Sequence, residues 1–405
     1  MKVLITGAAG QMAQPVIKYL STLPIVDEIR LGDLSEERLA DVIKEQGSPK
    51  CKPFKLDVRN PQLLAEALTG QDLILNLVGP YYHFGTTVLE AAIKSRVDYV
   101  DIVDDFDTTQ QLLDLNEQAA QAGITALIAT GASPGVTNVL SRLSADYMGQ
   151  VEEINTSWVV GEANSNYTGA LVHLFHVMGN EIPTFENGKT KYIMPGQPDG
   201  ARIVNFPQPL GACEVFQIGH PEPVTLSRFI PGVKTVTNRG AIWPEDKNNM
   251  FRVLVASGFT SEQKVPFRDL MVAPLDFFEV LFNIAKQTSP PDTEPSKMAM
   301  CVEVIGKKNN QDINHTYFLA DYGEMETFTG MSAAVAVEMM LNGSAKTKGV
   351  IAPECLDPLQ YMHKLSQATE GYDKLFLMET INGDLNRAGR FYNKKIWDDL
   401  WNKEI

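Results

Sequence analysis

Small residues recur near the N-terminus, where Gly7, Gly10 and Ala13 give the pattern G-x-x-G-x-x-A. Glycines allow the backbone to turn sharply and to approach a ligand, and the free N–H groups at a helix start bind anions. A turn of this kind between a strand and a helix can hold the pyrophosphate of a dinucleotide. The stricter pattern G-x-G-x-x-G is absent, and the alternative is a strand–helix turn without a ligand. The expected cofactor-binding residues of the turn are Gly7, Ala9, Gly10, Gln11 and Met12.

An acid follows the turn at the distance that dinucleotide recognition requires. Asp33 ends the apolar run 25–31 and lies about twenty positions after Ala13, where a carboxylate accepts hydrogen bonds from a ribose 2′-OH. The same carboxylate would repel a 2′-phosphate, so the sequence favours NAD over NADP. Arg38, one helical turn further on, leaves NADP possible.

Polar residues also follow later strands of the chain. Asp101 ends a predicted strand, where it could anchor a substrate ammonium group, accept a proton, or cap the next helix. Ser133 and Asn138 lie at a predicted helix start, where they could line the cleft and bind a carboxylate or a phosphate. Asp57 follows the third strand and could face an adenine or cap the helix 60–68.

Two histidines, His173 and His176, are three residues apart and therefore share one face of the predicted helix 170–178. With no third ligand nearby, zinc is not expected, and packing or substrate binding is favoured. The four cysteines are widely spaced and show no C-x-x-C, so neither a disulfide framework nor a zinc site is indicated, and no metal is expected.

These residues need a scaffold of alternating strands and helices. Apolar runs at 2–6, 25–31, 51–56, 71–78, 97–102 and 124–129 alternate with helical segments, one of them at 107–123. This order predicts an α/β fold, a Rossmann-type doubly wound parallel sheet, with ligands at the carboxyl ends of its strands. The predicted dinucleotide-binding domain spans residues 1–133.

The pattern changes in the predicted inserted domain, residues 134–325, which we expect to be an antiparallel α+β substrate and dimerisation domain. Its predicted strands include 151–160, 224–230 and 249–257, and its predicted hairpin joins 298–306 to 316–321. An apolar helix at 333–341 predicts that residues 326–370 return to complete the first domain. Residues 371–405 are expected to form a surface helix and C-terminal arm.

Composition limits the function classes. The 405 residues are 44% hydrophobic and 21% charged, which is ordinary for a globular protein, and the length favours two domains. The net charge of −15 argues against nucleic acid or an anionic membrane as a partner. No run approaches the length of a membrane span and no signal peptide precedes the first strand, so the default location is cytoplasmic.

Several segments together resemble the saccharopine dehydrogenase-like family of oxidoreductases, in the family's order and over most of residues 1–360. The segments are VLITGAAG, NLVGPYYHFGTTVLEAAIKSRVDYVD, GASPGVTNVL, RFIPGVKTVTNRG, APLDFFEVLF, TGMSAAVAVEMMLNG and GVIAPE. One departure is Ser133, which stands where saccharopine reductases tend to carry the Asp of G-x-D-P-G. Saccharopine itself is therefore less favoured as the substrate.

The resemblance implies hydride transfer between a nicotinamide and a carbon that bears nitrogen, a small amine substrate, and a homodimer. It also implies that the backbone at Val78, Gly79 and Pro80 runs under the nicotinamide. Tyr82 and His83 would then contact the substrate or the ribose, although His83 could equally face solvent. Arg228 and Arg239 lie in the segment that resembles the family's substrate loop, where arginine could bind a substrate carboxylate.

We therefore expect an NAD-dependent oxidoreductase that acts on the C–N bond of an amino acid or polyamine-like substrate, as lysine 6-dehydrogenase or saccharopine dehydrogenase does. Asp101, His83 and Tyr82 are the candidate catalytic residues, and Ser133, Asn138, His173, Arg228 and Arg239 the candidate substrate-binding residues. One alternative is NADPH-dependent reductive condensation of the carboxynorspermidine synthase type. Another is a nucleotide-binding protein without catalysis.

Overall fold

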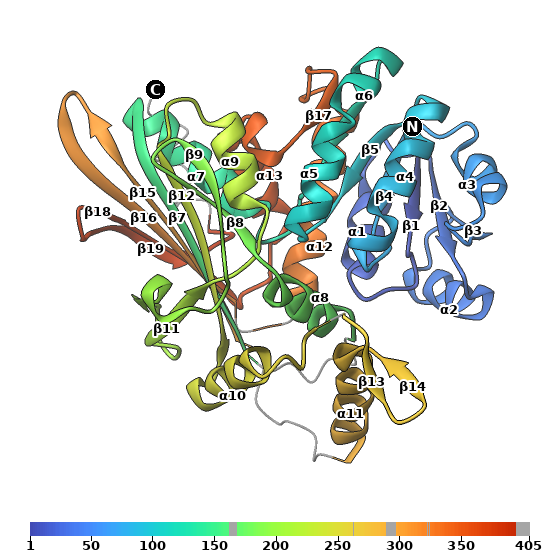
Figure 1. Cartoon of the computed structure of the whole chain (residues 1–405). Coiled ribbons are helices and arrows are strands. Elements are labelled where there is room, and N and C mark those ends of the chain that lie inside the picture. Colours follow the sequence, from blue (N-terminus) through green and yellow to red (C-terminus); the bar gives the residue numbers. More distant parts are fainter. Residues whose placement is uncertain (162–167, 262, 289–296, 322, 324, 394–405) are drawn as a thin grey trace.

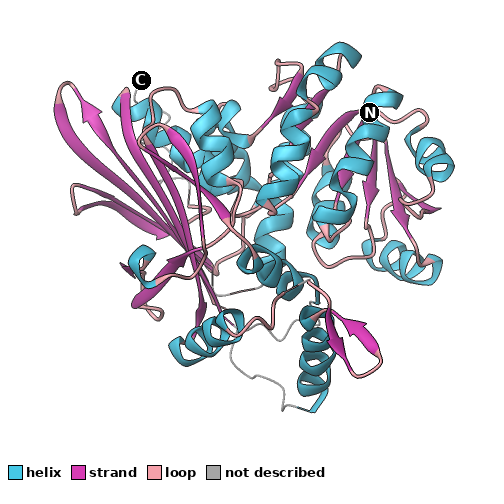
Figure 2. Ribbon diagram, in the orientation of Figure 1, coloured by secondary structure: helices cyan, strands magenta, loops and turns pink. Residues whose placement is uncertain are grey.

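The computed structural model describes residues 1–161, 168–261, 263–288, 297–321, 323 and 325–393. Two sheets organise the chain, with helices α5 (Phe106–Asp114) and α12 (Met325–Leu341) between them in Figure 1. The colouring in Figure 2 shows helices around the smaller sheet and a longer array of strands in the larger one. Within the described residues, no helix is long and apolar enough to cross a membrane.

The first sheet is parallel and has the order β17-β6-β5-β4-β1-β2-β3. The inner strand β1 is fully buried from Val3 to Ile5, as expected for a parallel sheet covered on both faces. The strands are β1 (Lys2–Thr6), β2 (Glu28–Asp33), β3 (Cys51–Lys55), β4 (Leu73–Asn76), β5 (Asp98–Asp101), β6 (Thr125–Leu127) and β17 (Gly349–Ile351). The predicted doubly wound fold is confirmed.

The connecting helices begin where the sequence provides caps. Ser35 accepts a hydrogen bond from the backbone of Arg38 at the start of α2, and Asn60 caps α3. The predicted helix 107–123 is instead two helices, because the chain breaks at Leu115. The helices are α1 (Ala13–Thr22), α2 (Glu36–Gln46), α3 (Pro61–Leu68), α4 (Tyr81–Ser95), α5 (Phe106–Asp114) and α6 (Asn116–Ala122).

A late segment returns to this sheet. Helix α12 (Met325–Leu341) packs against α1, and β17 pairs with β6. The buried hydroxyl of Ser332 donates to the backbone oxygens of Thr130 and Gly131, which fixes the loop after β6. The following helix, α13 (Pro358–Ala368), contacts both α12 and α7 (Val136–Met148). Residues far apart in sequence therefore hold the binding edge of the sheet.

The second sheet has the order β10-β11-β12-β7-β15-β16-β18-β19, with β8 beside β12 and β9 beside β8. The predicted hairpin is present as β15 and β16, and the parallel pair β7–β12 makes the sheet mixed. Its first strands are β7 (Gln150–Gly161), β8 (Ile182–Glu186), β9 (Lys189–Ile193), β10 (Arg202–Asn205), β11 (Ala212–Gln217) and β12 (Thr235–Trp243). The others are β15 (Met298–Lys308), β16 (Gln311–Asp321), β18 (Leu375–Ile381) and β19 (Asp384–Arg390), and β13 (Val265–Phe267) pairs with β14 (Leu270–Val272) elsewhere.

Three predictions in this region are wrong. The predicted strands 224–230 and 249–257 are helices α9 (Glu222–Phe229) and α10 (Glu245–Ala256). The surface helix expected after residue 371 is instead the hairpin of β18 and β19, whose strand β18 pairs with β16. Residues 394–405 of the expected arm lie outside the described residues. The remaining helices are α8 (Thr168–Gly179), α11 (Pro274–Thr288) and the short η1 (Pro198–Gly200) and η2 (Pro353–Cys355).

Gly330 offers a test of how α12 supports the glycine turn. A Cβ atom at Gly330 would lie 2.6 Å from the Met12 backbone oxygen and 2.5 Å from Pro15 Cγ. We predict that Gly330→Ala lowers the free energy of unfolding by about 1–3 kcal/mol through overpacking and weakens NADH binding by displacing the turn. Urea unfolding and NADH fluorescence titration measure both effects. Unchanged stability with unchanged binding would contradict this packing account.

Candidate active site

The glycine turn lies against the loop between β4 and α4. Gly7 has φ +71°, and a Cβ atom there would be 2.7 Å from the Leu77 backbone oxygen. The Gly10 N–H closes the turn by donating to the Gly7 oxygen at 3.0 Å. Only glycine fits at position 7, so the turn with Ala9, Gln11 and Met12 stays next to Val78, Gly79 and Pro80. This contact brings together the two segments expected to hold the pyrophosphate and the nicotinamide.

Asp33 closes the other side of the turn. Its Oδ2 accepts the Ala9 N–H at 3.0 Å and its Oδ1 accepts the Ser35 N–H at 3.2 Å. An ionised carboxylate offers about four acceptor positions, so a ribose hydroxyl can still bind. Arg38 reaches the same place, because its Nη2 donates to the Ala9 oxygen at 2.7 Å. These residues fit a dinucleotide, which would supply a hydride donor or acceptor at its nicotinamide.

Asp57 does not cap the following helix, so that alternative is wrong. Asn60 caps α3 by accepting from the N–H groups of Gln62 and Leu63. The Asp57 carboxylate pairs with Arg59 at 2.8 Å, and that partner lowers the pKa of Asp57. Asp57 remains half-buried after β3, and its contact with an adenine stays a prediction.

Asp101 is bound to the protein's own backbone. The side chain is fully buried, and its Oδ1 accepts from the N–H groups of Ala129 (2.7 Å) and Val103 (3.1 Å). Burial raises its pKa to about 6, against those two hydrogen bonds. The geometry favours a carboxylate that ties β5 to the loop after β6 over one that meets a substrate.

The start of α4 carries the two aromatic candidates. Tyr82 is half-buried, and its ring stacks on His176 of α8 with centroids 4.2 Å apart. His83 is exposed, which is the alternative noted from the sequence. Tyr82 therefore contacts the second domain, and His83 lies at the surface.

A cluster of acids and histidines joins the two domains after β5. His173 Nδ1 of α8 lies 2.7 Å from Asp105 Oδ1 and 3.4 Å from Asp104 Oδ1. His176 Nε2 lies 3.0 Å from Asp107 Oδ2. Burial alone would lower the pKa of His173, but the two neighbouring carboxylates outweigh it and raise that pKa to about 9. His173 is therefore a cation at neutral pH.

The same three side chains, Asp104, Asp105 and His173, place potential ligand atoms within 4.8 Å of one another. A protonated histidine has no lone pair for a metal and repels a cation. At neutral pH this geometry favours an ion pair.

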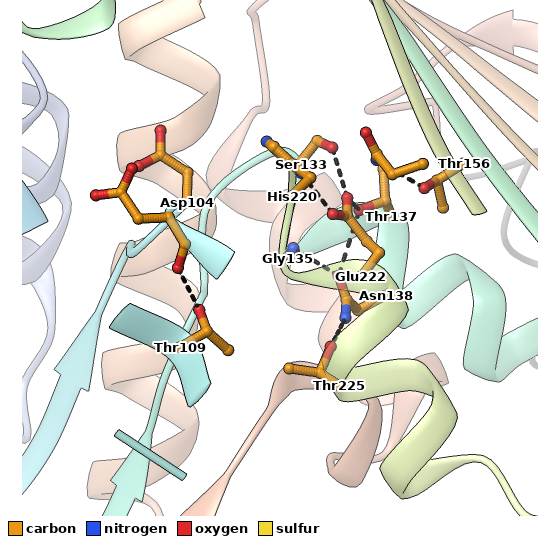
Figure 3. A network of polar contacts seen from close by, with 12 residues as sticks. Asp104, Thr109, Ser133, Gly135, Thr137, Asn138, Thr156, His220, Glu222 and Thr225 are labelled. Carbon is orange, nitrogen blue, oxygen red and sulfur yellow. Dashed lines mark hydrogen bonds and ion pairs between the residues drawn. The ribbon is translucent and has the colours of Figure 1, made fainter. Parts of the chain in front are cut away.

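A second buried group surrounds Glu222 at the start of α9 (Figure 3). Its Oε1 accepts from Ser133 Oγ at 2.7 Å and Thr137 Oγ1 at 2.9 Å, while its Oε2 lies 2.5 Å from His220 Nδ1. Burial alone would raise the pKa of Glu222, but His220 outweighs it, and the pKa is lowered. An acid from the second domain thus lies beside Ser133, the position at which the sequence resemblance leads us to expect an Asp.

Asn138 lies behind this group, where its whole amide is occupied. Its Nδ2 donates to Thr225 Oγ1 at 2.9 Å and Glu354 Oε2 at 3.0 Å, and its Oδ1 accepts the Gly135 N–H at 3.0 Å. The residue is fully buried, so the geometry favours a structural role over ligand binding. Burial raises the pKa of its partner Glu354 to about 7.

The two arginines are not brought to this cluster. Arg228 is exposed on the last turn of α9, with its guanidinium near the Phe229 ring. Arg239 is on β12, where it donates to the Gly200 backbone oxygen (2.9 Å) and to Thr237 Oγ1 (2.6 Å). Their predicted binding of a substrate carboxylate has no geometric support at the domain junction.

Sequence reasoning missed Asp105, His220 and Glu222 as site residues. Asp104 and Asp105 follow the predicted strand 97–102 in the sequence. Their position at a strand end was a usable signal, because parallel strands present their carboxyl ends at one edge. The short motif Gly219-His220-Pro221-Glu222 gave none, because its partners are on other elements.

A Rossmann sheet whose binding edge meets buried acids and histidines of a second domain is the architecture of a two-domain nicotinamide-dependent oxidoreductase. The "Saccharopine dehydrogenase NADP binding domain" model matches residues 3–127, and the "Saccharopine dehydrogenase C-terminal domain" model matches residues 131–370. The chain belongs to the saccharopine dehydrogenase family. The family resemblance, the oxidoreductase class and the nicotinamide cofactor are thereby confirmed, whereas the choice between NAD and NADP is not.

Two relatives align with this chain over nearly their whole length. Carboxyaminopropylagmatine dehydrogenase of Synechocystis sp. is 26% identical, over 90% of this chain and 95% of that protein. Carboxynorspermidine synthase of Vibrio cholerae is 23% identical, over 93% and 97%. The structure of apo saccharopine dehydrogenase (L-Glu forming) from Saccharomyces cerevisiae aligns with a TM-score of 0.65 at 17% identity, over 94% and 99%, which supports the fold.

The His173 cluster predicts a pH-dependent stability. The pKa of His173 rises from 6.5 in the unfolded chain to about 9 in the folded protein. The ion pair therefore stabilises the fold fully below pH 6.5, and this stabilisation is lost as pH rises to 9. The difference corresponds to roughly 3 kcal/mol at most. We predict that the free energy of unfolding of the wild type, relative to His173→Gln, falls across this window in urea titrations. A difference that stays constant between pH 6 and pH 9.5 would contradict the ion pair.

Proposed function

We propose that the protein makes or breaks the C–N bond of a carboxylated polyamine, with NAD as the preferred cofactor. The relatives' names support the substrate class, because carboxyaminopropylagmatine and carboxynorspermidine both combine a carboxyl group with a polyamine. The proposal therefore covers both the amine oxidation and the reductive condensation considered from the sequence.

The observation that carries this proposal is the excess of acids at the domain junction. Asp104, Asp105 and Asp107 follow β5 at the carboxyl edge, where His173 and His176 of α8 pair with them at 2.7–3.4 Å. The side chains of Asp104 and Asp107 are each 35% exposed, so they can pair with ammonium groups of a substrate. A net charge of −15 attracts a polycation further.

The reaction changes two neighbouring substrate atoms, the carbon that exchanges a hydride with the cofactor and the nitrogen that exchanges a proton with the protein. In the oxidative direction the C–H bond loses a hydride to the cofactor, the N–H bond loses a proton, and a C=N bond forms. Water then adds to the C=N bond and releases an amine and a carbonyl compound. The residues at the junction must orient the substrate, exclude competing water, and accept the proton.

Turnover tests the proposal directly. Purified protein is incubated with NADH or NADPH, an amino-acid semialdehyde and a panel of diamines, and absorbance at 340 nm is followed. We predict cofactor oxidation that requires both the aldehyde and the amine, with a secondary amine identified by mass spectrometry. The reverse assay uses that product with NAD or NADP at alkaline pH. Cofactor binding without turnover of any pair would instead support a non-catalytic nucleotide-binding protein.

The cofactor preference rests on Asp33, with Arg38 beside it as the group able to hold a 2′-phosphate. We predict that Asp33→Ala raises the Kd for NADH at least tenfold, through loss of a charge-assisted hydrogen bond worth about 1.5–3 kcal/mol, and weakens NADPH less. Fluorescence titration of both cofactors gives the ratio of the two Kd values. Asp41→Ala, which removes an exposed acid of α2, is the matched control. An unchanged Kd ratio in Asp33→Ala would reject this assignment.

The homodimer and the cytoplasmic location expected from the sequence remain predictions.

A further inference from the structure

His220 and Glu222 form a buried pair that belongs to the second domain but lies at the junction. His220 is 3% exposed and Glu222 is fully buried. The short contact between His220 Nδ1 and Glu222 Oε2, 2.5 Å, connects the end of the segment after β11 to the first turn of α9. Figure 3 shows His220, Ser133 and Thr137 grouped around Glu222, with Asp104 across from them.

The surroundings of Glu222 keep it ionised and fixed. Ser133 and Thr137 donate to its other carboxylate oxygen, and Thr137 lies in the first turn of α7, whose dipole favours a negative charge. An ionised carboxylate only accepts hydrogen bonds, so Nδ1 of His220 must carry a hydrogen. When the ring is neutral, Nε2 is then the basic nitrogen.

His220 is also the histidine that lies next to the His173 cluster. The ring centroids of His220 and His173 are 6.0 Å apart, edge to face, and the ring centroid of Trp158 of β7 lies 5.7 Å from that of His220. His173 is a poor proton acceptor at neutral pH, because Asp104 and Asp105 hold it as a cation. Asp101 is fully buried, and its Oδ1 accepts from two backbone N–H groups. Of these three groups, His220 is the one suited to exchange a proton at neutral pH.

We propose that His220 Nε2 exchanges the proton of the substrate nitrogen, and that Glu222 is the positioning residue that fixes its tautomer. The proposal rests on the proposed function and assigns its proton step. In the oxidative direction the hydride and its electron pair leave carbon for the cofactor, the N–H proton moves to His220 Nε2, and C=N forms. In the reductive direction the same nitrogen returns the proton.

Kinetics of matched variants test the assignment. His220→Asn keeps a donor to Glu222 but removes Nε2, so kcat should fall by about 10²–10⁴-fold. The Kd for NADH should stay within twofold. One limb of the wild-type kcat–pH profile should be absent from that of His220→Asn; the titratable groups that face His220 are Glu222, His173 and Asp104. His363→Asn, on α13, where the ring lies 2.7 Å from the Gln367 amide, is the control for loss of a histidine. Retention of kcat or of that limb in His220→Asn would overturn the proposal.

A tautomer measurement tests the pair without turnover. ¹⁵N NMR of histidine-labelled protein with NADH bound should show neutral His220 protonated at Nδ1. In Glu222→Gln the side-chain amide can donate to Nδ1, so the proton should move to Nε2 and kcat should fall. An Nε2-protonated wild type would overturn the proposal even if variants fail to fold. A wild type that turns over no amine, yet shows the Nδ1 tautomer, would overturn the proposed function instead.

Discussion

The Asp105 carboxylate is the contact on which the junction depends. It is 1% exposed, and its Oδ2 accepts the Tyr82 N–H at 3.1 Å while its Oδ1 meets His173 at 2.7 Å. One side chain thus joins the start of α4, directly after the predicted nicotinamide loop, to α8 of the second domain. Breaking one partner of a buried pair leaves an uncompensated charge, which strongly destabilises the fold. The buried charges of Asp105 in the first domain and His173 in the second domain therefore depend on each other for stability.

Other buried groups hold this edge in place. Ser332 of α12 fixes the loop after β6, Gly7 brings the turn against the β4–α4 loop, and Asn138 connects α7 to Glu354. These contacts link segments separated by as many as 216 residues. The junction can therefore present a preorganised set of charges, which favours transition states better than groups that must reorganise.

Much of the fold of the first domain was predictable from the sequence, because the spacing of apolar residues and the residue types of turns are local features of the chain. Alternating apolar runs and helices located the parallel sheet, and the turn near Gly7 located the predicted dinucleotide site. The second domain was harder. The stretches at 224–230 and 249–257 carry apolar residues typical of strands, yet both are helices, since packing against the sheet outweighed local preference.

The site shows the same division between local and tertiary information. Asp101 was expected to meet substrate from its strand-end position, but its carboxylate is turned to the backbone of Ala129 and Val103. Arg239 was expected at the substrate loop, and β12 instead places it beside Gly200. His220 became a candidate only once Glu222, Ser133 and Thr137 were seen around it. Tertiary partners of this kind leave no spacing signal in one sequence.

In the proposed mechanism the first domain binds the nicotinamide cofactor, and His220 of the second domain exchanges the proton of the substrate nitrogen. A crystal structure of the protein with NAD and a carboxylated polyamine tests it most directly. The account predicts that the secondary nitrogen lies within hydrogen-bond distance of His220 Nε2, with a terminal ammonium near Asp104 or Asp107. A substrate nitrogen bound next to Asp101, or on the Arg239 face of the second sheet, would contradict it.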